Sequence, residues 1–160
     1  MVLMPDGPCA FVTQPALGGP LRYEGHYRDG LRDGLWSVTR AGSGGRCWEI
    51  TWSMGEWHGL ARAWYRNGQL EDEGEYAHGC HTGVWTYWFE TGQLAAQGTY
   101  ETDRKVGDWQ YWDKVGRPMQ WPDWQRQYGL GDYDFAYDDY TGMPRGENWP
   151  HPPRPAASDE

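Results

Sequence analysis

Polar and apolar residues alternate along most of this chain, and no window shows apolar residues at the spacing that is typical of a helix. Alternation is typical of β-strands, whose successive side chains point to opposite faces of a sheet. The pattern recurs in four similar blocks, at residues 21–45, 46–69, 70–93 and 94–117. We therefore predict an all-β fold, an elongated single-layer antiparallel β-meander of tandem hairpins with an irregular C-terminal tail.

Glycine marks both ends of each predicted hairpin. At one end a Gly-x-x-x-Gly spacing recurs, at Gly30/Gly34, Gly55/Gly59 and Gly79/Gly83, with Asp103/Gly107 in the fourth block. At the other end stands Asn67-Gly68, which is typical of a two-residue turn with positive φ at both positions.

These turns predict the register of the neighbouring strands. The turn at Asn67-Gly68 would pair Arg66 with Gln69, Arg62 with Glu73 and Ala61 with Gly74. The same turn at Thr91-Gly92 would place Trp85 opposite Gly98, so that the indole covers the glycine.

Alternation also divides the side chains between two faces. One face is apolar and collects Trp85, Tyr87, Phe89, Leu94, Ala96, Gly98 and Tyr100. The other face is polar and collects Arg62, Trp64, Glu71, Glu73, Glu75, Thr86, Trp88, Gln97 and Thr99. Because Asp72 falls on the opposite face from Glu71 and Glu73, these acids predict a surface stripe and not a catalytic pair of carboxylates.

The chain is poor in aliphatic residues and rich in large aromatic ones. Only 38% of its residues are hydrophobic, and it has 12 Trp and 11 Tyr against 3 Phe. Such a chain can bury area through flat, partly wet aromatic side chains, which suits a thin sheet better than a thick core.

The two ends of the chain lie outside the repeats. Residues 1–20 contain CAFVTQ, which we expect to form a strand that protects the edge of the sheet. Residues 119–160 are acidic, aromatic and proline-rich, and 122–128 could form a short helical turn. Because exposed aromatic rings are costly, we expect residues 119–140 to dock on the apolar face and those after 143 to be disordered.

The net charge of −9 limits the partners of the protein. Nucleic acids and anionic lipids bind basic surfaces, so neither they nor a membrane is an expected partner, whereas a basic protein is. Three cysteines at no recognised spacing do not predict a disulfide framework, which indicates a reducing compartment. Without a signal peptide or a membrane-spanning stretch, we expect a cytoplasmic protein.

Four residues near the Gly-x-x-x-Gly segments are candidate metal ligands: His58, His78, Cys80 and His81. Adjacent blocks are expected about 10 Å apart, whereas zinc needs four ligands at about 2.0–2.3 Å. The stretch 42–45 (GSGG) resembles a phosphate loop only in composition, because no lysine follows it, and it is interpreted as a hairpin loop. We therefore predict no metal, no cofactor and no enzymatic activity.

The motifs shared by the blocks are Asn67-Gly68-Gln69-Leu70, Thr91-Gly92-Gln93-Leu94, Glu73-Gly74-x-Tyr76 and Gly83-x-Trp85-x-Tyr87. With these motifs the chain resembles the MORN repeat, and more closely its variant in bacterial antitoxin and immunity proteins of the YwqK type. Block 46–69 departs from the pattern, with Ile50 in place of the strand glycine and Ala61 in place of the tryptophan. The resemblance implies an elongated antiparallel meander with an interaction role, and it carries over no catalytic residues.

A row of tryptophans on the polar face is the candidate binding site, with Trp64, Trp88 and Trp112 at one per block. Tryptophan beside arginine is typical of interface anchors. The charged residues expected around the row are Arg62, Glu49, Glu73 and Glu75. We predict that this face binds a basic protein, a cognate toxin such as a nuclease, and neutralises it.

Other interpretations of these features stay open. The tryptophan row could pack against residues 119–140, or stack along the sheet for stability alone. The protein could be a structural scaffold or a membrane-tethering repeat without a toxin partner. The apolar face could also be covered by a second copy in a homodimer.

Overall fold

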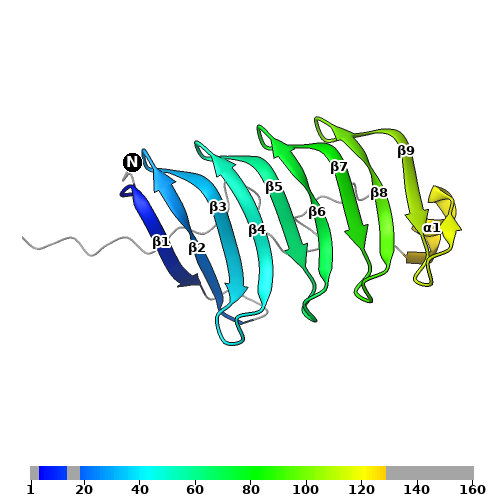
Figure 1. Ribbon diagram of the computed structural model, residues 1–160, viewed down its shortest axis with the longest axis horizontal. Helices are drawn as coiled ribbons and strands as arrows, with labels where there is room; N and C mark the ends of the chain where they lie inside the picture. The colour runs from blue at the N-terminus through cyan, green and yellow to red at the C-terminus, as the bar shows by residue number, and fades with distance from the viewer. Residues whose placement is uncertain (1–3, 14–18, 129–160) are drawn as a thin grey trace, which may run out of the picture.

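The computed structural model describes residues 4–13 and 19–128, which form one open sheet of ten strands and one short helix (Figure 1). Neighbouring strands are antiparallel, and they follow one another in the sheet in chain order. The strands are β1 (Gly7–Thr13), β2 (Leu21–Arg28), β3 (Leu31–Arg40), β4 (Arg46–Ser53), β5 (Glu56–Trp64), β6 (Leu70–Ala77), β7 (Cys80–Trp88), β8 (Leu94–Glu101), β9 (Arg104–Trp112) and β10 (Pro118–Met119), and the helix is α1 (Trp121–Tyr128). The predicted all-β, elongated, single-layer antiparallel meander of tandem hairpins is confirmed.

Two-residue turns close the hairpins at one end of the sheet. Arg28 pairs with Leu31 across Asp29-Gly30, and both turn residues have positive φ, of 50° and 73°. Later hairpins repeat this geometry at Met54-Gly55, His78-Gly79 and Thr102-Asp103. Positive φ at both positions defines a type I′ turn, whose twist matches that of the strands it joins. The first member of each Gly-x-x-x-Gly spacing is thus the second residue of such a turn.

The turn at Asn67-Gly68 differs from its prediction. The Gly68 amide donates to the Tyr65 carbonyl at 3.0 Å, and the Tyr65 amide donates to the Gln69 carbonyl at 2.9 Å. Of the two predicted turn residues, only Gly68 has positive φ, of 89°. The loop therefore has three residues, a type I turn followed by a left-handed glycine. The expected pairing of Arg66 with Gln69 is wrong.

Beyond the loop, a bulge restores the predicted register. Glu71 is the extra residue, because Trp64 pairs with Leu70 while Ala63 pairs with Asp72. The pairs predicted further along the strands are therefore correct: Arg62 with Glu73, Ala61 with Gly74, and Trp85 with Gly98 in the next hairpin.

Three tryptophans lie flat on glycines of the preceding strand. A Cβ at Gly74 would lie 2.1 Å from the Trp85 ring, and the Trp85 indole N–H donates to the Glu75 carbonyl at 3.1 Å. The same ring contact and hydrogen bond recur for Trp36 over Gly25 and for Trp109 over Gly98. Trp85 therefore covers Gly74 on β6, and the prediction that it covers Gly98 on β8 is wrong.

The second block replaces this glycine and tryptophan together. Ile50 stands at the glycine position and Ala61 at the tryptophan position, and the two residues are paired and fully buried. The larger side chain has moved from β5 to β4, so the space between the strands stays filled. The two departures of this block from the repeat pattern compensate each other.

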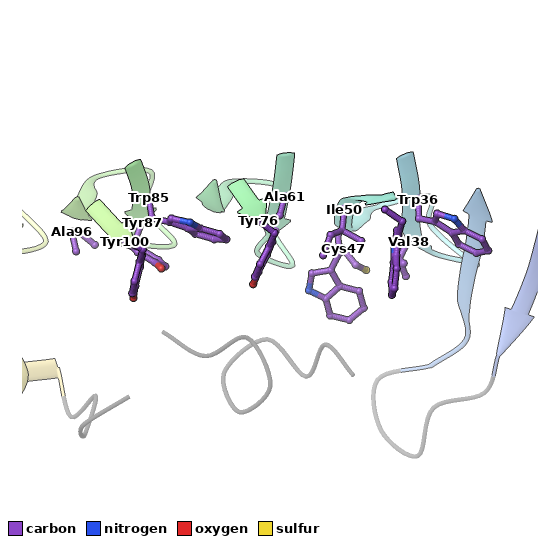
Figure 2. Close-up of a cluster of buried hydrophobic side chains, with 14 of the residues drawn as sticks. Trp36, Val38, Cys47, Ile50, Ala61, Tyr76, Trp85, Tyr87, Ala96 and Tyr100 are labelled. Atoms are coloured by element: carbon purple, nitrogen blue, oxygen red, sulfur yellow. The ribbon is translucent and has the colours of Figure 1, made fainter. Parts of the chain in front are cut away.

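The hydrophobic core lies on one face of the sheet, from which its side chains extend in one direction (Figure 2). Near the type I′ turns the core is a column of stacked rings and cations. Its members are Tyr27, Arg32, Trp52, Trp57, Tyr76, His81 and Tyr100, and neighbours lie 4.6–6.0 Å apart. Arg32 is only 4% exposed, and burial lowers the pKa of its guanidinium. Its charge is stabilised by the ring faces on both sides.

Helix α1 covers the last part of the core face (Figure 1). Trp124 is 1% exposed, its ring centroid lies 5.4 Å from that of Tyr111, and its indole N–H donates to the Trp112 carbonyl at 2.9 Å. The short helix expected at 122–128 is therefore present, and it docks on the apolar face as expected. The rest of the predicted docking segment and tail, 129–160, lies outside the described residues.

The contact between Trp85 and Gly74 predicts a strong effect of one methyl group. In Gly74→Ala the new Cβ would overlap the indole ring, so Trp85 must leave both the glycine and the Glu75 carbonyl. We expect the free energy of unfolding to fall by roughly 1–3 kcal/mol in urea denaturation. Gly42→Ala is the matched control, because a Cβ there meets nothing within 4 Å. Equal losses in the two variants would contradict the packing role of Trp85.

Candidate protein-binding face

Trp64, Trp88 and Trp112 lie on the face of the sheet opposite the core. Each directly follows a buried core residue on its strand, namely Ala63, Tyr87 and Tyr111. Because successive strand residues point to opposite faces, the three indoles point away from the core, and all three are partly exposed. They end β5, β7 and β9, so the row has one tryptophan on every second strand.

Residues of the intervening strands extend this tryptophan row. The pairs are Trp64 with Leu70, Trp88 with Leu94, and Trp112 with Pro118. The Arg46 guanidinium lies 5.2 Å from the Trp64 ring centroid, within the range of a cation–π contact. The row therefore combines indole, aliphatic and guanidinium surface, the residue types that anchor protein interfaces.

Charged residues form a second row across the same face. Arg62 pairs with Glu49 on one side and with Glu73 on the other. The Arg62 Nε donates to Glu73 Oε2 at 2.6 Å, and its Nη1 lies 3.9 Å from Glu49 Oε2. These side chains are 24–37% exposed, so the pairs contribute little to stability. Two carboxylates on one guanidinium, with exposed Glu75 beside them, leave this row of charges negative.

Helix α1 does not cover the tryptophan row. It packs on the core face, where Trp124 and Tyr128 contact Phe89. Helix α1 therefore does not make the contact with the tryptophan row that the alternative with residues 119–140 requires. Residues 129–140 lie outside the described residues. What the arrangement offers chemically is a broad surface for another protein, with apolar anchors beside negative charge.

Two residues lie on the face opposite to that predicted. Glu71 was expected beside Glu73, but the bulge turns both Glu71 and Asp72 towards the core, where they are 9% and 4% exposed. Leu94 was expected on the apolar face, but a bulge at Ala95 places it opposite Trp88. Alternation fails at both positions because a bulge adds one residue to one strand. The prediction that alternation separates Glu71 from Asp72 is wrong.

His81 links two neighbouring hairpins within the ring column. Its Nδ1 lies 2.6 Å from Asp103 Oδ1, its backbone N–H donates to the same oxygen at 2.7 Å, and its Nε2 lies 3.1 Å from the Tyr76 hydroxyl. Burial acts to raise the pKa of Asp103, but hydrogen bonds from His81 and Cys80 outweigh it and lower that pKa.

Cys80 beside this group lacks the properties of a nucleophile. Its hydrogen bond to Asp103 raises the pKa of the thiol, which favours the protonated form. Sequence reasoning treated His81 as a polar residue of a turn and missed its link to Asp103. The signal was available, because Asp103 replaces the turn glycine that Gly79 supplies in the preceding block.

The other candidate metal ligands lie at the turn ends. The ring centroids of His58 and His78 are 5.2 Å apart, so the expected separation of about 10 Å is wrong for this pair. The Glu56 carboxylate lies 3.5 Å from His78 Nδ1, and both side chains are well exposed. Within residues 4–13 and 19–128, no three His, Cys, Asp or Glu side chains are placed to hold a metal ion.

Comparison with known families identifies part of the sheet. The MORN repeat variant family matches residues 57–78 and 82–102, which include β6, β8 and most of β5 and β7. No curated protein matches the chain. These stretches are thus similar to MORN repeats, and such repeats suggest a repeat-based binding module. The described part of the chain contains no helix with the length and hydropathy that a membrane span requires.

The buried Glu71 predicts a pH-dependent change in stability. Burial, together with the negative charges of Asp72 and Glu90, raises the pKa of Glu71 to about 8, above the value of about 4.3 in an unfolded chain. The folded protein therefore holds this proton more tightly, and stability falls as the pH rises from about 4 to about 8, by at most about 5 kcal/mol at about 1.4 kcal/mol per pKa unit.

In Glu71→Gln this loss should disappear, because the amide does not ionise. Urea denaturation at about pH 5 and about pH 8 should show the variant gaining stability relative to the parent protein at the higher pH. Glu75→Gln, on the same strand but exposed on the other face, should show no such gain. A parallel pH response of both variants would mean that Glu71 titrates as an ordinary surface acid.

Proposed function

We propose that this protein neutralises a basic protein, a cognate bacterial toxin, by binding it through the tryptophan face. The observation that carries the proposal is the row of Trp64, Trp88 and Trp112, which the sheet holds outside its own core. Large aromatic side chains that stay partly in water cost free energy, and they supply much of the binding energy of protein interfaces. The role is that of an antitoxin or immunity protein in the cytoplasm, in line with the resemblance to proteins of the YwqK type.

The size of the row supports a protein as the partner. Strands lie about 4.8 Å apart, so tryptophans on every second strand are about 10 Å apart and the three span about 20 Å. A typical specific interface buries about 800 Å² on each partner, which a patch of this length can supply. A small ligand, by contrast, would be buried by a concave pocket.

Charge favours a basic partner. The chain carries a net charge of −9, and on the tryptophan face Glu49, Glu73 and Glu75 lie around the guanidinium of Arg62. Opposite charge raises the rate of association and disfavours acidic competitors. Nuclease toxins, which must bind nucleic acid, carry the basic surface that such a face would recognise.

His81 and Cys80 are the side chains that most resemble an active site, and their interactions agree with a binding role without catalysis. Asp103 and the Tyr76 hydroxyl hold the two ring nitrogens of His81, and the pKa of the Cys80 thiol is raised. The interactions of His81 join two hairpins, and the protonated Cys80 is a weak nucleophile.

The direct test uses the protein encoded next to this one in the genome. We expect that protein to arrest growth when expressed alone, that co-expression restores growth, and that the two bind with submicromolar affinity in calorimetry. Replacing Trp64, Trp88 and Trp112 together by Ala should weaken binding by about 100-fold or more, because interface tryptophans are typical hot spots.

The control is Val12→Ala on β1, which removes an exposed apolar side chain far from the row and should leave affinity unchanged. Circular dichroism establishes that each variant keeps its sheet. A folded triple variant with full affinity would exclude the tryptophan face as the binding surface. A neighbour that is neither toxic nor bound would point instead to a structural scaffold.

A further inference from the structure

The tryptophan row carries an apolar side chain on every strand from β5 to β10. Indoles end β5, β7 and β9, and the residue paired with each indole fills the strand that follows it. In order across the sheet the row is Trp64, Leu70, Trp88, Leu94, Trp112 and Pro118. Neighbouring strands lie about 4.8 Å apart, so the row offers an apolar contact about every 4.8 Å over a length of about 24 Å.

A polar row lies beside the tryptophan row on the same face. Its members, paired from strand to strand, are Glu49, Arg62, Glu73, Thr86, Gln97 and Gln110. Two carboxylates against one guanidinium leave this row negative from β4 to β6. From β7 to β9 its side chains are uncharged, and Gln97 Nε2 donates to the Thr86 hydroxyl at 2.9 Å. The polar row is therefore acidic beside Trp64 and uncharged beside Trp112.

The step of about 4.8 Å matches an α-helix better than other peptide conformations. Side chains on one side of an extended strand recur about every 6.8 Å, and those of a polyproline helix about every 9.3 Å. The stripe at i, i+3 or i+4, and i+7 of an α-helix has a mean step of about 5.3 Å. A helix along the row would contact every strand with an accumulated mismatch of about 2 Å. A polyproline helix could contact the indoles but would leave out Leu70 and Leu94.

The width of a helix joins the two rows. The polar row lies about 7 Å from the tryptophan row, because Arg62, Thr86 and Gln110 each precede an indole by two residues on the same strand. A helix with its side chains is about 10–12 Å across, so a helix seated on the indoles covers the polar row with one flank. Positive charge on that flank is favoured beside Trp64, whereas beside Trp112 it meets only uncharged side chains of the polar row.

We propose that the partner docks on the tryptophan face with one amphipathic α-helix, which lies across the strands with its apolar side on the tryptophan row and its basic residues at the Trp64 end. The inference rests on the tryptophan face being the binding surface, as proposed above, and it adds the form and the direction of the element that this face binds. Helices recognised in this way contribute their apolar side, and neighbouring charges fix their direction.

Three synthetic peptides of about 21 residues, each with two arginines near one end, test the form of this element by isothermal titration. The first has leucines at i, i+3, i+7, i+10, i+14 and i+17 among alanine and glutamine, so that it forms an amphipathic helix. The second has the same composition with leucine at alternate positions, and the third has proline at every third position. The first peptide should bind at least about tenfold more tightly than the others, because only it contacts every strand of the row.

Two pairs of variants locate the bound peptide. Trp88→Ala should weaken binding of the helical peptide by about tenfold, because it removes the central anchor, and Val12→Ala on β1 should leave binding unchanged. Glu73→Gln should weaken binding by about threefold. Glu101→Gln, which removes the same charge from the type I′ turn end of β8, should have no effect. With glutamine in place of the peptide's arginines, the effect of Glu73→Gln should disappear, and circular dichroism establishes that each variant keeps its sheet.

Nuclear magnetic resonance tests the conformation and the direction of the bound peptide. The Cα chemical shifts of the peptide should become helical in the complex. A nitroxide at the arginine end should broaden the indole N–H signal of Trp64 more than that of Trp112, and a nitroxide at the opposite end should reverse this order.

Three results would overturn the proposal: failure of the helical peptide to bind more tightly than the other two, Cα shifts of an extended chain in the complex, or equal effects of Glu73→Gln and Glu101→Gln. These measurements need no toxin. A toxin that binds through the tryptophan face, while the helical peptide shows none of these preferences, would refute the helix alone. A helical peptide that binds as expected, without a toxin encoded next to this protein, would refute the neutralising role alone.

Discussion

Where Trp85 lies flat on Gly74, its ring occupies the space of a side chain on the neighbouring strand, and its N–H reaches the Glu75 carbonyl. A single-layer sheet has no second sheet to cover its core, so side chains that lie along the surface must exclude water from one another. Tryptophan can do this only where the strand beside it carries no Cβ. The glycine precedes its tryptophan by eleven residues in three blocks, at 25 and 36, 74 and 85, and 98 and 109. This contact therefore fixes the hairpin length, and the length fixes the repeat.

The ring column then joins one hairpin to the next. The amide of Gly55 donates to the Arg32 carbonyl, that of Gly79 to the Trp57 carbonyl, and that of Asp103 to the His81 carbonyl, so each of these three type I′ turns is bonded to the hairpin before it. The side chains of Arg32, Trp57 and His81 stack between aromatic rings at the same positions. Hydrogen bonds and stacking both act between neighbours only, as in other repeat proteins, and stability is expected to build up hairpin by hairpin.

Much of this fold follows from the sequence, because alternation and turn residues report directly on strands and their register. The pairing of Arg62 with Glu73 is correct for this reason. The prediction chose the wrong glycine for Trp85, because the neighbouring strands on both sides carry one, Gly74 on β6 and Gly98 on β8. Pairing Trp85 with Gly98 does not say which of the two glycines the ring covers. The face of Glu71 was misassigned because alternation assumes one residue per step, which a bulge violates. A signal for the bulge was present, since Ala95 and Ala96 are adjacent, apolar and aligned with Glu71 and Asp72.

Two blocks depart from the repeat pattern in their buried residues, and the two departures differ in whether a neighbouring strand compensates the change. Ile50 and Ala61 exchange a large and a small residue across one pair of strands, and both are fully buried, so this departure is explained by packing alone. Glu71 and Asp72 replace apolar residues with two acids, and no nearby residue of the sheet supplies a countercharge to Glu71. Volume that is balanced between neighbouring strands is explained by packing, whereas burial of Glu71 raises its pKa and makes the stability of the sheet depend on pH. The partly exposed tryptophans lie on the other face, outside the core of the described sheet, and they support the binding role that is proposed for that face.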